Sequence, residues 1–407
     1  MTCRLCEGNN LHPFLDLGLH PPSDQFRSIE QLNNPVIFYP LVVNICDDCG
    51  FVQLGYVVPA EILYQDNYPY ESSTTQTGRK HYFEFAKAVV EDFNLQRNDL
   101  AVDIGSNVGV LLEGFRSLGL RVQGIDPASN ICQIAEKRGI PTLNSFFDEV
   151  SANQIMSKLG SAAVITGTNV FAHIDDLDAF MNAIKLLLDK ERGVFVIEAP
   201  HLLHLVKTLE YDTIYHEHLS YISIEPLIPF FKKFGMEIIN VEERDIHGGS
   251  IRIFVSNVGT YRIGPNVSRI LELEKAAGLR NRTILNEFAE RVEENKLQLQ
   301  ALLSNIKSSG KRIVAVSAPA KGMTLLNYCK IDGQILDYVT EKSNLKIGRY
   351  TPGSLIPIRS DDSLLDDPPD YALLLAWNFA TEIMYNNKEF IARGGKFIIP
   401  IPKPRIV

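Results

Sequence analysis

The chain has 407 residues, of which 45% are hydrophobic and 22% are charged, and its formal net charge is −9. This composition is typical of a globular protein, and the length is sufficient for two or three domains that each bury a core. The acidic balance argues against nucleic-acid binding, because no surplus of Lys and Arg is present to neutralise phosphates. No stretch reads as a targeting signal or is long enough to cross a bilayer, so we expect a cytoplasmic protein without a membrane partner.

Four of the six cysteines form two C-x-x-C pairs near the N-terminus. Cys3 and Cys6 make the first pair, and Cys46 and Cys49 make the second. Two thiolate pairs of this spacing can complete a tetrahedral Cys₄ zinc site, which leaves no open position for catalysis. We therefore predict a structural zinc (Zn) in an N-terminal module of residues 1–66, which is too small to rely on its own core.

A tyrosine-rich stretch, YQDNYPYESSTT, follows this module and contains Tyr64, Tyr68 and Tyr70. Tyrosines in a polar, proline-containing loop usually pack on the surface. The functional alternative is a flap whose phenols reach into a neighbouring site. Apolar residues at helical spacing then predict a helix over 76–93.

An apolar run at 100–109, LAVDIGSNVG, passes directly into a glycine-rich turn. This pattern is typical of the first strand of a nucleotide-binding α/β sheet, with a helix from Val110. Gly105 and Gly109 allow backbone torsions and a close ligand approach that a side chain would prevent. Asp103 comes before the first glycine, whereas a dinucleotide-binding turn would read G-x-G-x-x-G. The turn instead resembles the D-x-G-x-x-x-G form of class I methyltransferases that use S-adenosylmethionine.

The next apolar run ends at Asp126, where a carboxylate can hold the hydroxyls of a ribose. Strand and helix patterns continue to alternate up to residue 200, which predicts a parallel, doubly wound sheet. Ligands of such sheets lie beyond the carboxyl ends of the strands, so Asn169 and His173 are expected at the mouth of the site. The predicted cofactor-binding residues are Asp103, Gly105, Ser106, Asn107, Gly109, Asp126 and Asn169.

The most unusual segment is TLEYDTIYHEHLSYIS at 208–223, which follows a predicted strand. It places ionisable and aromatic groups close together, more densely than a fold needs. Such a cluster provides a histidine that titrates near neutrality, a carboxylate to orient it, and phenols that can donate to a developing oxyanion.

The C-terminal part begins again with elements of an α/β layer. Near-heptad apolar spacing predicts a long helix over 285–306 that links domains, with a coiled-coil dimer arm as the alternative. Predicted strands follow at 313–316, 335–339, 372–376 and 396–399, with a helix from Met323. Lys321, Lys346 and Arg349 are the natural cations for a diphosphate, although isolated cations of this kind are often solvated surface residues.

Taken together, these motifs resemble the nucleotide-sugar C-methyltransferases. The resemblance rests on the four-cysteine module, the D-x-G-x-x-x-G turn, YHEHLSY, HGGSIRIFV, AKGMTLLNY, KIGRYTPGSLIPI and LLLAWNF, in this order along nearly the whole chain. The family transfers a methyl group to C3 of a 4-keto deoxysugar. The resemblance implies a central Rossmann-like class I methyltransferase domain (67–262), the N-terminal zinc module, and a second α/β, Rossmann-like domain (263–407).

The resemblance also implies roles for individual residues. His218 corresponds to the general base, Tyr215 and Glu217 to its companions, and His173 to a second histidine that faces the sugar. Further implied substrate contacts are Tyr68, Tyr70, Ser250, Lys321, Lys346 and Arg349. The implied cofactor is S-adenosyl-L-methionine, the implied substrate is carried by dTDP or GDP, and we expect a monomer.

Two features depart from the family pattern, namely the turn SAPAKG and Glu341 at a strand end where aspartate is more usual. Three alternatives to C-methylation remain open from the sequence. They are an O- or N-methyltransferase acting on the same sugar, a zinc-ribbon protein that binds or modifies RNA, and a nicotinamide-dependent oxidoreductase.

Overall fold

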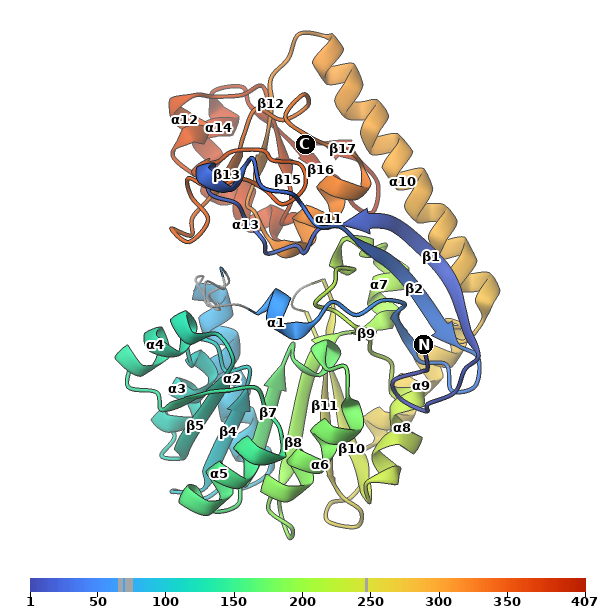
Figure 1. Ribbon diagram of the computed structural model, residues 1–407, viewed down its shortest axis with the longest axis vertical. Coiled ribbons are helices and arrows are strands. Elements are labelled where there is room, and N and C mark those ends of the chain that lie inside the picture. Colours follow the sequence, from blue (N-terminus) through green and yellow to red (C-terminus); the bar gives the residue numbers. More distant parts are fainter. Residues whose placement is uncertain (65–68, 70–75, 246–247) are drawn as a thin grey trace.

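The computed structural model describes residues 1–64, 69, 76–245 and 248–407, and its strands form three sheets (Figure 1). A seven-stranded sheet lies in the lower half of the view and a six-stranded sheet in the upper half. The long helix α10 (Arg282–Ser308) runs along one side of the molecule next to a long N-terminal hairpin. The α/β class and the separate N-terminal cysteine module expected from the sequence are both present.

The N-terminal sheet is antiparallel and takes one strand from the middle of the chain. Its strands are β1 (Leu11–His20), β2 (Tyr39–Cys46), β3 (Val52–Leu54) and β9 (Ser220–Tyr221). The same part of the chain contains the short helices η1 (Ile29–Gln31) and α1 (Ala60–Leu63). The strand order is β1-β2-β3-β9, so the segment after YHEH completes the sheet of the zinc module. The module is therefore tied directly to the segment that carries the candidate catalytic residues.

The middle sheet has the order β10-β11-β8-β7-β4-β5-β6. Its strands are β4 (Leu100–Ile104), β5 (Arg121–Asp126), β6 (Thr142–Asn144), β7 (Val164–Thr168), β8 (Val194–Pro200), β10 (Met236–Arg244) and β11 (Ser250–Asn257). The strands from β6 to β8 are parallel, and β11 runs antiparallel to β8 and β10. All five residues of β4 are buried, as expected for a central strand covered on both faces.

Helices pack around this sheet in the order expected of alternating strand and helix patterns. They are α2 (Gln76–Asp92), α3 (Val110–Ser117), α4 (Ser129–Lys137), α5 (Glu149–Leu159), η2 (Phe171–His173), α6 (Leu177–Leu187), α7 (Leu202–Thr208), η3 (Tyr211–Thr213), α8 (Ile224–Lys233) and α9 (Pro265–Ala276). The sequence predicts that the strand at 251–255 closes the sheet. It lies instead between β8 and β10, and the edge strand β10 is not among the elements predicted from sequence.

The C-terminal sheet has the order β14-β13-β12-β15-β16-β17, with only β17 antiparallel to its neighbour. Its elements are β12 (Ile313–Val316), α11 (Ala320–Tyr328), β13 (Val339–Glu341), β14 (Ile358–Ser360), α12 (Ser363–Asp366), β15 (Tyr371–Leu374), η4 (Trp377–Phe379), α13 (Ala380–Asn386), α14 (Lys388–Ala392), β16 (Lys396–Ile399) and β17 (Arg405–Ile406). The strand predicted at 335–339 begins only at Val339, because the preceding residues form a turn whose amides bond to the Asp332 carbonyl.

The predicted domain boundaries do not coincide with separate hydrophobic cores. One cluster of buried side chains joins Leu17 of β1 and Val43 of β2 to Phe288 of α10 and to Ile313 and Leu373 of the C-terminal sheet. Helix α9, which follows the predicted boundary at 262, packs against β10 and α8 of the middle sheet. The zinc module therefore shares its core with the C-terminal part, consistent with its small size.

Candidate active site

A cavity of about 760 Å³ lies where the three parts of the chain meet. The carboxyl ends of β4, β5 and β7 contribute to it from the middle sheet, and those of β12, β13 and β15 from the C-terminal sheet. The chain around α1 and the YHEH segment line it as well. The cavity thus joins the predicted cofactor turn to the predicted catalytic cluster.

The turn after β4 has the backbone geometry that the sequence predicts. Gly105 has φ +61° and Gly109, the N-cap of α3, has φ +79°. A Cβ atom on Gly105 would lie 2.5 Å from a methyl group of Val170, and one on Gly109 would lie 2.8 Å from Ile140. Both positions therefore require glycine for torsion and for space. Gly105 lines the cavity, whereas Gly109 is not among the lining residues and begins helix α3 as its N-cap.

Two carboxylates at adjacent strand ends shape this turn. Asp126 at the end of β5 accepts hydrogen bonds from the backbone amides of Asn107 at 3.0 Å and Ala128 at 2.9 Å. Asp103 in β4 accepts from the Thr166 hydroxyl at 2.6 Å. Burial raises the pKa of Asp103 to about 7, although the Thr166 hydrogen bond opposes the rise. Asp103 therefore titrates close to neutral pH.

Polar groups without partners face the same part of the cavity. Among the described residues, the buried hydroxyls of Ser106 and Thr168 have no hydrogen-bond partner. Asn169 adopts φ +56° and its backbone amide donates to the Glu198 carbonyl at 2.7 Å, which turns the residue toward the cavity. Buried polar groups normally bond to something, so this edge is suited to a polar ligand.

His218 is held in a defined tautomer. Its Nδ1 donates to the Thr213 carbonyl at 2.7 Å, because a carbonyl oxygen can only accept. In the neutral ring Nε2 then carries the lone pair and accepts from the Tyr215 hydroxyl at 2.8 Å. The centroids of these two rings lie 4.1 Å apart. The imidazole and phenol thus form a connected proton-accepting pair at the cavity wall.

A second histidine stands next to this pair. His173 in η2 lies with its ring centroid 5.0 Å from that of His218, and its Nδ1 bonds to the Tyr64 hydroxyl at 2.9 Å. Its Nε2 is buried and has no partner among the described residues. Burial and the neighbouring His218 hold the pKa of His173 well below its usual range, so the ring is neutral.

Glu217 is buried at the cavity wall, and Asp24, from the segment between β1 and η1, lines the same cavity. Tyr64 belongs to the tyrosine-rich stretch that the sequence offers as a flap over a neighbouring site, whereas Asp24 is not singled out from the sequence. No local pattern marks Asp24, since it reaches the cavity through long-range packing of the N-terminal part. A tyrosine-rich loop was the only sequence signal near Tyr64.

Lys321 contributes a cation from the C-terminal sheet. Its Nζ lies 3.8 Å from Asp212 Oδ2 and 4.5 Å from the Trp377 ring centroid, and it has no hydrogen-bond partner among the described residues. Asp212 is fully buried and accepts from Trp377 Nε1 at 2.7 Å. Nearby, the Thr324 hydroxyl of α11 donates to the Ile214 carbonyl at 2.9 Å. The C-terminal part therefore fixes the chain immediately before Tyr215.

Lys346 and Glu341 organise the turn after β12. Lys346 Nζ donates to the Ala318 carbonyl at 2.8 Å and lies 4.8 Å from the Phe26 ring centroid. Glu341 at the end of β13 accepts from the Ala318 amide at 3.0 Å and from the Ser343 amide at 3.1 Å. The glutamate that departs from the family pattern thus reaches back to the turn, as Asp126 does in the middle sheet.

Two predicted substrate residues in the described part of the chain, Ser250 and Arg349, do not line this cavity. Ser250 begins β11 and is buried, and neither it nor Arg349 is among the lining residues. Tyr68 and Tyr70 lie outside the described residues. The substrate contacts expected of these four residues stay predictions.

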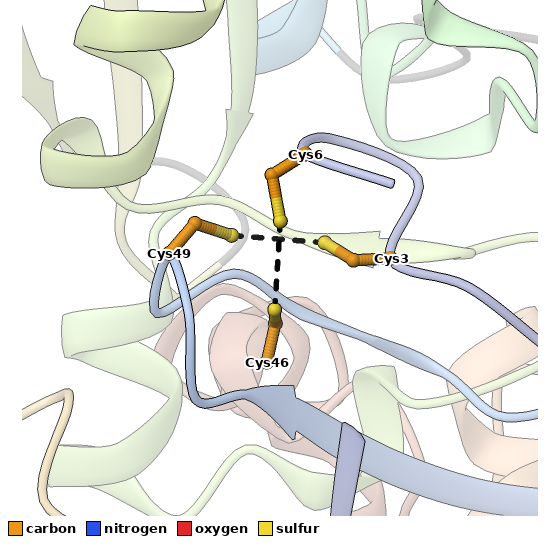
Figure 2. A group of neighbouring side chains, drawn as sticks. All are labelled: Cys3, Cys6, Cys46 and Cys49. Carbon is orange, nitrogen blue, oxygen red and sulfur yellow. Dashed lines mark hydrogen bonds between the residues drawn. The ribbon is translucent and has the colours of Figure 1, made fainter. Parts of the chain in front are cut away.

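The four predicted cysteines converge in the N-terminal module (Figure 2). All four Sγ atoms lie within 4.8 Å of one another, with Cys3–Cys49 and Cys6–Cys46 separations of 3.6 Å. Zn–S bonds of about 2.3 Å in a tetrahedron place sulfurs about 3.8 Å apart. Figure 2 shows the sulfurs pointing to a common centre, so the donor set fits zinc.

Comparisons with known proteins identify the family. The C-methyltransferase C-terminal domain matches residues 245–402, a zinc binding domain matches 3–64, and a methyltransferase domain matches 79–241. The C-methyltransferase NovU of Streptomyces niveus is 35% identical over 406 residues, which cover 100% of this chain and 96% of the relative. The chain belongs to this C-methyltransferase family.

Solved structures include more distant methyltransferases. The magnesium protoporphyrin IX methyltransferase of Synechocystis PCC 6803 with bound SAM is 13% identical, covering 44% of this chain and 79% of its own, with a TM-score of 0.34. An S-adenosylmethionine-dependent methyltransferase from Clostridium acetobutylicum ATCC 824 is 17% identical, covering 44% and 92%, with a TM-score of 0.36.

The protein is thus an S-adenosylmethionine-dependent C-methyltransferase with a class I methyltransferase fold and a structural zinc site. The turn after β4 fits the cofactor, because the Gly105 position leaves no room for a side chain and the Ser106 hydroxyl has no partner among the described residues. Within the described ranges, no helix combines the length and apolar character needed to span a bilayer.

Proposed function

We propose that this C-methyltransferase methylates C3 of a 4-keto deoxysugar carried by a nucleoside diphosphate such as dTDP or GDP. One observation carries the proposal: a single cavity joins the glycine turn, a histidine with an oriented lone pair, and two lysines. This arrangement provides a place for a methyl donor, a base for a carbon acid, and cations for an anionic carrier.

The cofactor is assigned to the edge of the middle sheet. Asp126 would hold the ribose hydroxyls and Asp103 would face the amino-acid end, with Ser106 and Asn169 completing the polar contacts. When bound there, S-adenosylmethionine supplies a sulfonium methyl group. The residues of the turn would hold the cofactor, and His218 lines the same cavity.

We assign the removal of the proton from C3 of the sugar to His218. Thr213 fixes the tautomer, so Nε2 is the nitrogen that gains the proton. The Tyr215 hydroxyl already bonds to Nε2 and can relay the proton by accepting it from carbon while passing its own to nitrogen. The bond broken is C3–H, and the electron pair remains on the sugar as an enolate.

We assign the stabilisation of the enolate oxygen to His173. We take the Tyr64 hydroxyl as the donor to Nδ1 in this contact, which would leave the hydrogen of the neutral ring on Nε2. That nitrogen has no partner among the described residues and can donate to the ketone oxygen as negative charge develops there.

The nucleotide is assigned to the edge of the C-terminal sheet. Lys321 and Lys346 line the cavity there, in a protein that is acidic overall. Glu341 and the turn after β12 repeat the placement of Asp126 and the turn after β4. Two such sheet edges facing one cavity suit two ligands, the cofactor and a sugar nucleotide.

The test is the position of the transferred methyl group. The zinc-loaded enzyme is incubated with ¹³C-methyl-labelled S-adenosylmethionine and a 4-keto deoxysugar nucleotide whose sugar is uniformly ¹³C-labelled. We expect carbon–carbon coupling between the methyl and C3. A methyl signal coupled directly to no ring carbon, as in an O- or N-methyl product, would overturn the proposal.

A further inference from the structure

Arg4 lies in the turn between Cys3 and Cys6 of the zinc site (Figure 2), yet its side chain contacts distant parts of the chain. The side chain is only 5% exposed. Its backbone amide donates to Gln53 Oε1 at 2.8 Å, which ties the turn to β3. A buried guanidinium group that donates to several acceptors is held in one place, unlike a solvated surface arginine.

The guanidinium group first contacts the segment that carries His218. Arg4 Nη1 donates to the Leu219 carbonyl at 3.2 Å, and Leu219 directly follows His218. The same nitrogen donates to the Leu54 carbonyl of β3 at 3.1 Å. The Leu54 amide in turn donates to the Leu219 carbonyl at 2.9 Å. The backbone next to the candidate base is therefore joined to the zinc module through Arg4 and β3.

The same guanidinium group also contacts the segment that carries His173. Arg4 Nε donates to Asp175 Oδ1 at 2.9 Å, and Asp175 follows His173 by two residues and lines the cavity. The Asp175 side chain is 60% exposed, so this ion pair adds little to stability and mainly fixes position. One arginine thus contacts both histidine-bearing segments, whose two imidazole ring centroids lie 5.0 Å apart.

We propose that Arg4 is a positioning residue that fixes the His173 and His218 segments relative to each other, and thereby links the zinc site to the cavity. The guanidinium group is planar and rigid, so it sets the distance between the acceptors that it contacts. Zinc held by Cys3 and Cys6 would fix the turn from which Arg4 projects. The effect on turnover rests on the proposed function, in which both histidines act on the sugar, but the positioning is a property of the protein alone.

The direct test is ¹⁵N NMR spectroscopy of the zinc-loaded full chain with labelled histidines and no substrate. We expect Arg4→Met to shift or broaden the ring signals of both His173 and His218, because their segments lose a common contact. The zinc content, measured by mass spectrometry, should stay at the wild-type value. Arg282→Met is the matched control, since Arg282 donates to Asp47 beside the other cysteine pair at 2.8 Å, and should leave both sets of signals unchanged. Wild-type signals of both histidines in zinc-loaded Arg4→Met would overturn the proposal.

Two further variants keep the test decisive. Arg4→Lys retains the positive charge but offers a single nitrogen, so it should displace the same signals and replaces Arg4→Met if that variant does not fold. Asp175→Ala removes only the contact to the His173 segment, so it should shift the His173 signals and leave the His218 Nδ1 signal in place. Unchanged His173 signals in Asp175→Ala would overturn the claim that Arg4 positions both segments.

A kinetic readout separates positioning from a loss of structure. Arg4→Met should lower kcat about tenfold or more, because the two histidines no longer meet the substrate in the correct geometry. The KM for the sugar nucleotide and the affinity for S-adenosylhomocysteine should stay at wild-type values. An equal loss of cofactor affinity and of kcat would overturn the positioning role. If the wild type does not methylate the sugar but the NMR signals respond as expected, the positioning by Arg4 stands and only the proposed function falls.

Discussion

The middle sheet and the C-terminal sheet, both composed mainly of parallel strands, face one cavity with similar edges but different chemistry. In both, an acidic residue at the end of the neighbouring strand holds a backbone amide of the first turn, Asp126 in one and Glu341 in the other. The first turn is open, with Gly105 at φ +61°. The second has Pro319 at the N-cap of α11 and presents Lys321 beside it.

Under the proposed function, this difference would let one architecture serve two ligands. A glycine turn lets a ligand approach the backbone closely, whereas a closed turn flanked by lysines offers charge to an anion. The comparison assigns the cofactor to the first edge and the nucleotide to the second. Variants at one edge should therefore leave ligand binding at the other unchanged.

Among variants at the two edges, the largest effect should come from the cationic edge. Lys321→Met should raise KM for the sugar nucleotide about 10–100-fold, because a charge-assisted contact to phosphate is lost, and should leave the affinity for S-adenosylmethionine unchanged. Calorimetry with the cofactor and steady-state kinetics measure the two quantities. Lys396→Met, an exposed lysine of the same sheet, is the control.

Lys321 also faces the buried Asp212 carboxylate, so loss of stability must be separated from loss of contact. The double variant Lys321→Met with Asp212→Asn removes the unpaired charge and should recover the melting temperature. KM should remain high in the double variant. A KM that recovers with stability would assign Lys321 a structural role only.

At the open edge, Gly105→Ala should weaken S-adenosylmethionine binding about tenfold or more, because the φ of +61° disfavours a side chain. A Cβ there would also meet Val170 at 2.5 Å. Gly160→Ala is the matched control, since Gly160 has φ +83° but an added Cβ would have no neighbouring atom within 4 Å. Similar cofactor affinity in both variants would break the assignment of the turn.

Asp103 makes the cofactor affinity depend on pH. Its pKa of about 7 means that the Asp103 carboxylate, which we assign to the amino-acid end of the cofactor, is present above pH 7 and lost as the pH falls through 7. Binding should weaken about tenfold between pH 8 and pH 6, and Asp103→Asn should flatten this dependence. Calorimetry across this range provides the measurement.

The same group should act in the opposite direction on the stability of the cofactor-free protein. Because its folded-state pKa is raised above the ordinary value of 3.8, its contribution to stability is present below about pH 4 and lost as the pH rises to about 7. Asp103→Asn should therefore be relatively more stable than wild type at pH 8. Chemical denaturation at pH 5 and pH 8 provides the measurement. If the assignment were wrong, the difference in unfolding free energy between Asp103→Asn and the wild type would be equal at the two pH values.

The smallest effect is expected where the C-terminal sheet supports the catalytic segment. Thr324→Val removes the hydrogen bond to the Ile214 carbonyl, which costs about 1 kcal/mol. Both the melting temperature and kcat should fall slightly, with the affinity for the cofactor unchanged. Thr283→Val on α10, away from the cavity, is the control for a general loss of a hydroxyl.

Local patterns were sufficient to predict the elements whose chemistry is local. The glycine turn, Asp126 and the four cysteines follow from spacing alone, because backbone torsion and metal geometry demand particular residues at particular intervals. The YHEH segment was marked by its density of ionisable groups. These predictions rest on a few adjacent residues each.

Other parts depend on packing between distant segments and had no local signal. Asp24 enters the cavity because the N-terminal part shares its core with α10 and the C-terminal sheet. The strand β9 has only two residues and exists because β3 pairs with it. Pairing and burial of this kind are properties of the whole fold.

The central claim is that His218 removes a proton from the carbon that receives the methyl group. The direct measurement is deuterium incorporation at C3 of the 4-keto sugar nucleotide in D₂O, with the cofactor site filled by S-adenosylhomocysteine, which has no methyl to transfer. We predict exchange with the wild type and a loss of about 100-fold or more in His218→Asn, with unchanged affinity for S-adenosylhomocysteine. Exchange at the wild-type rate in that variant would contradict the account.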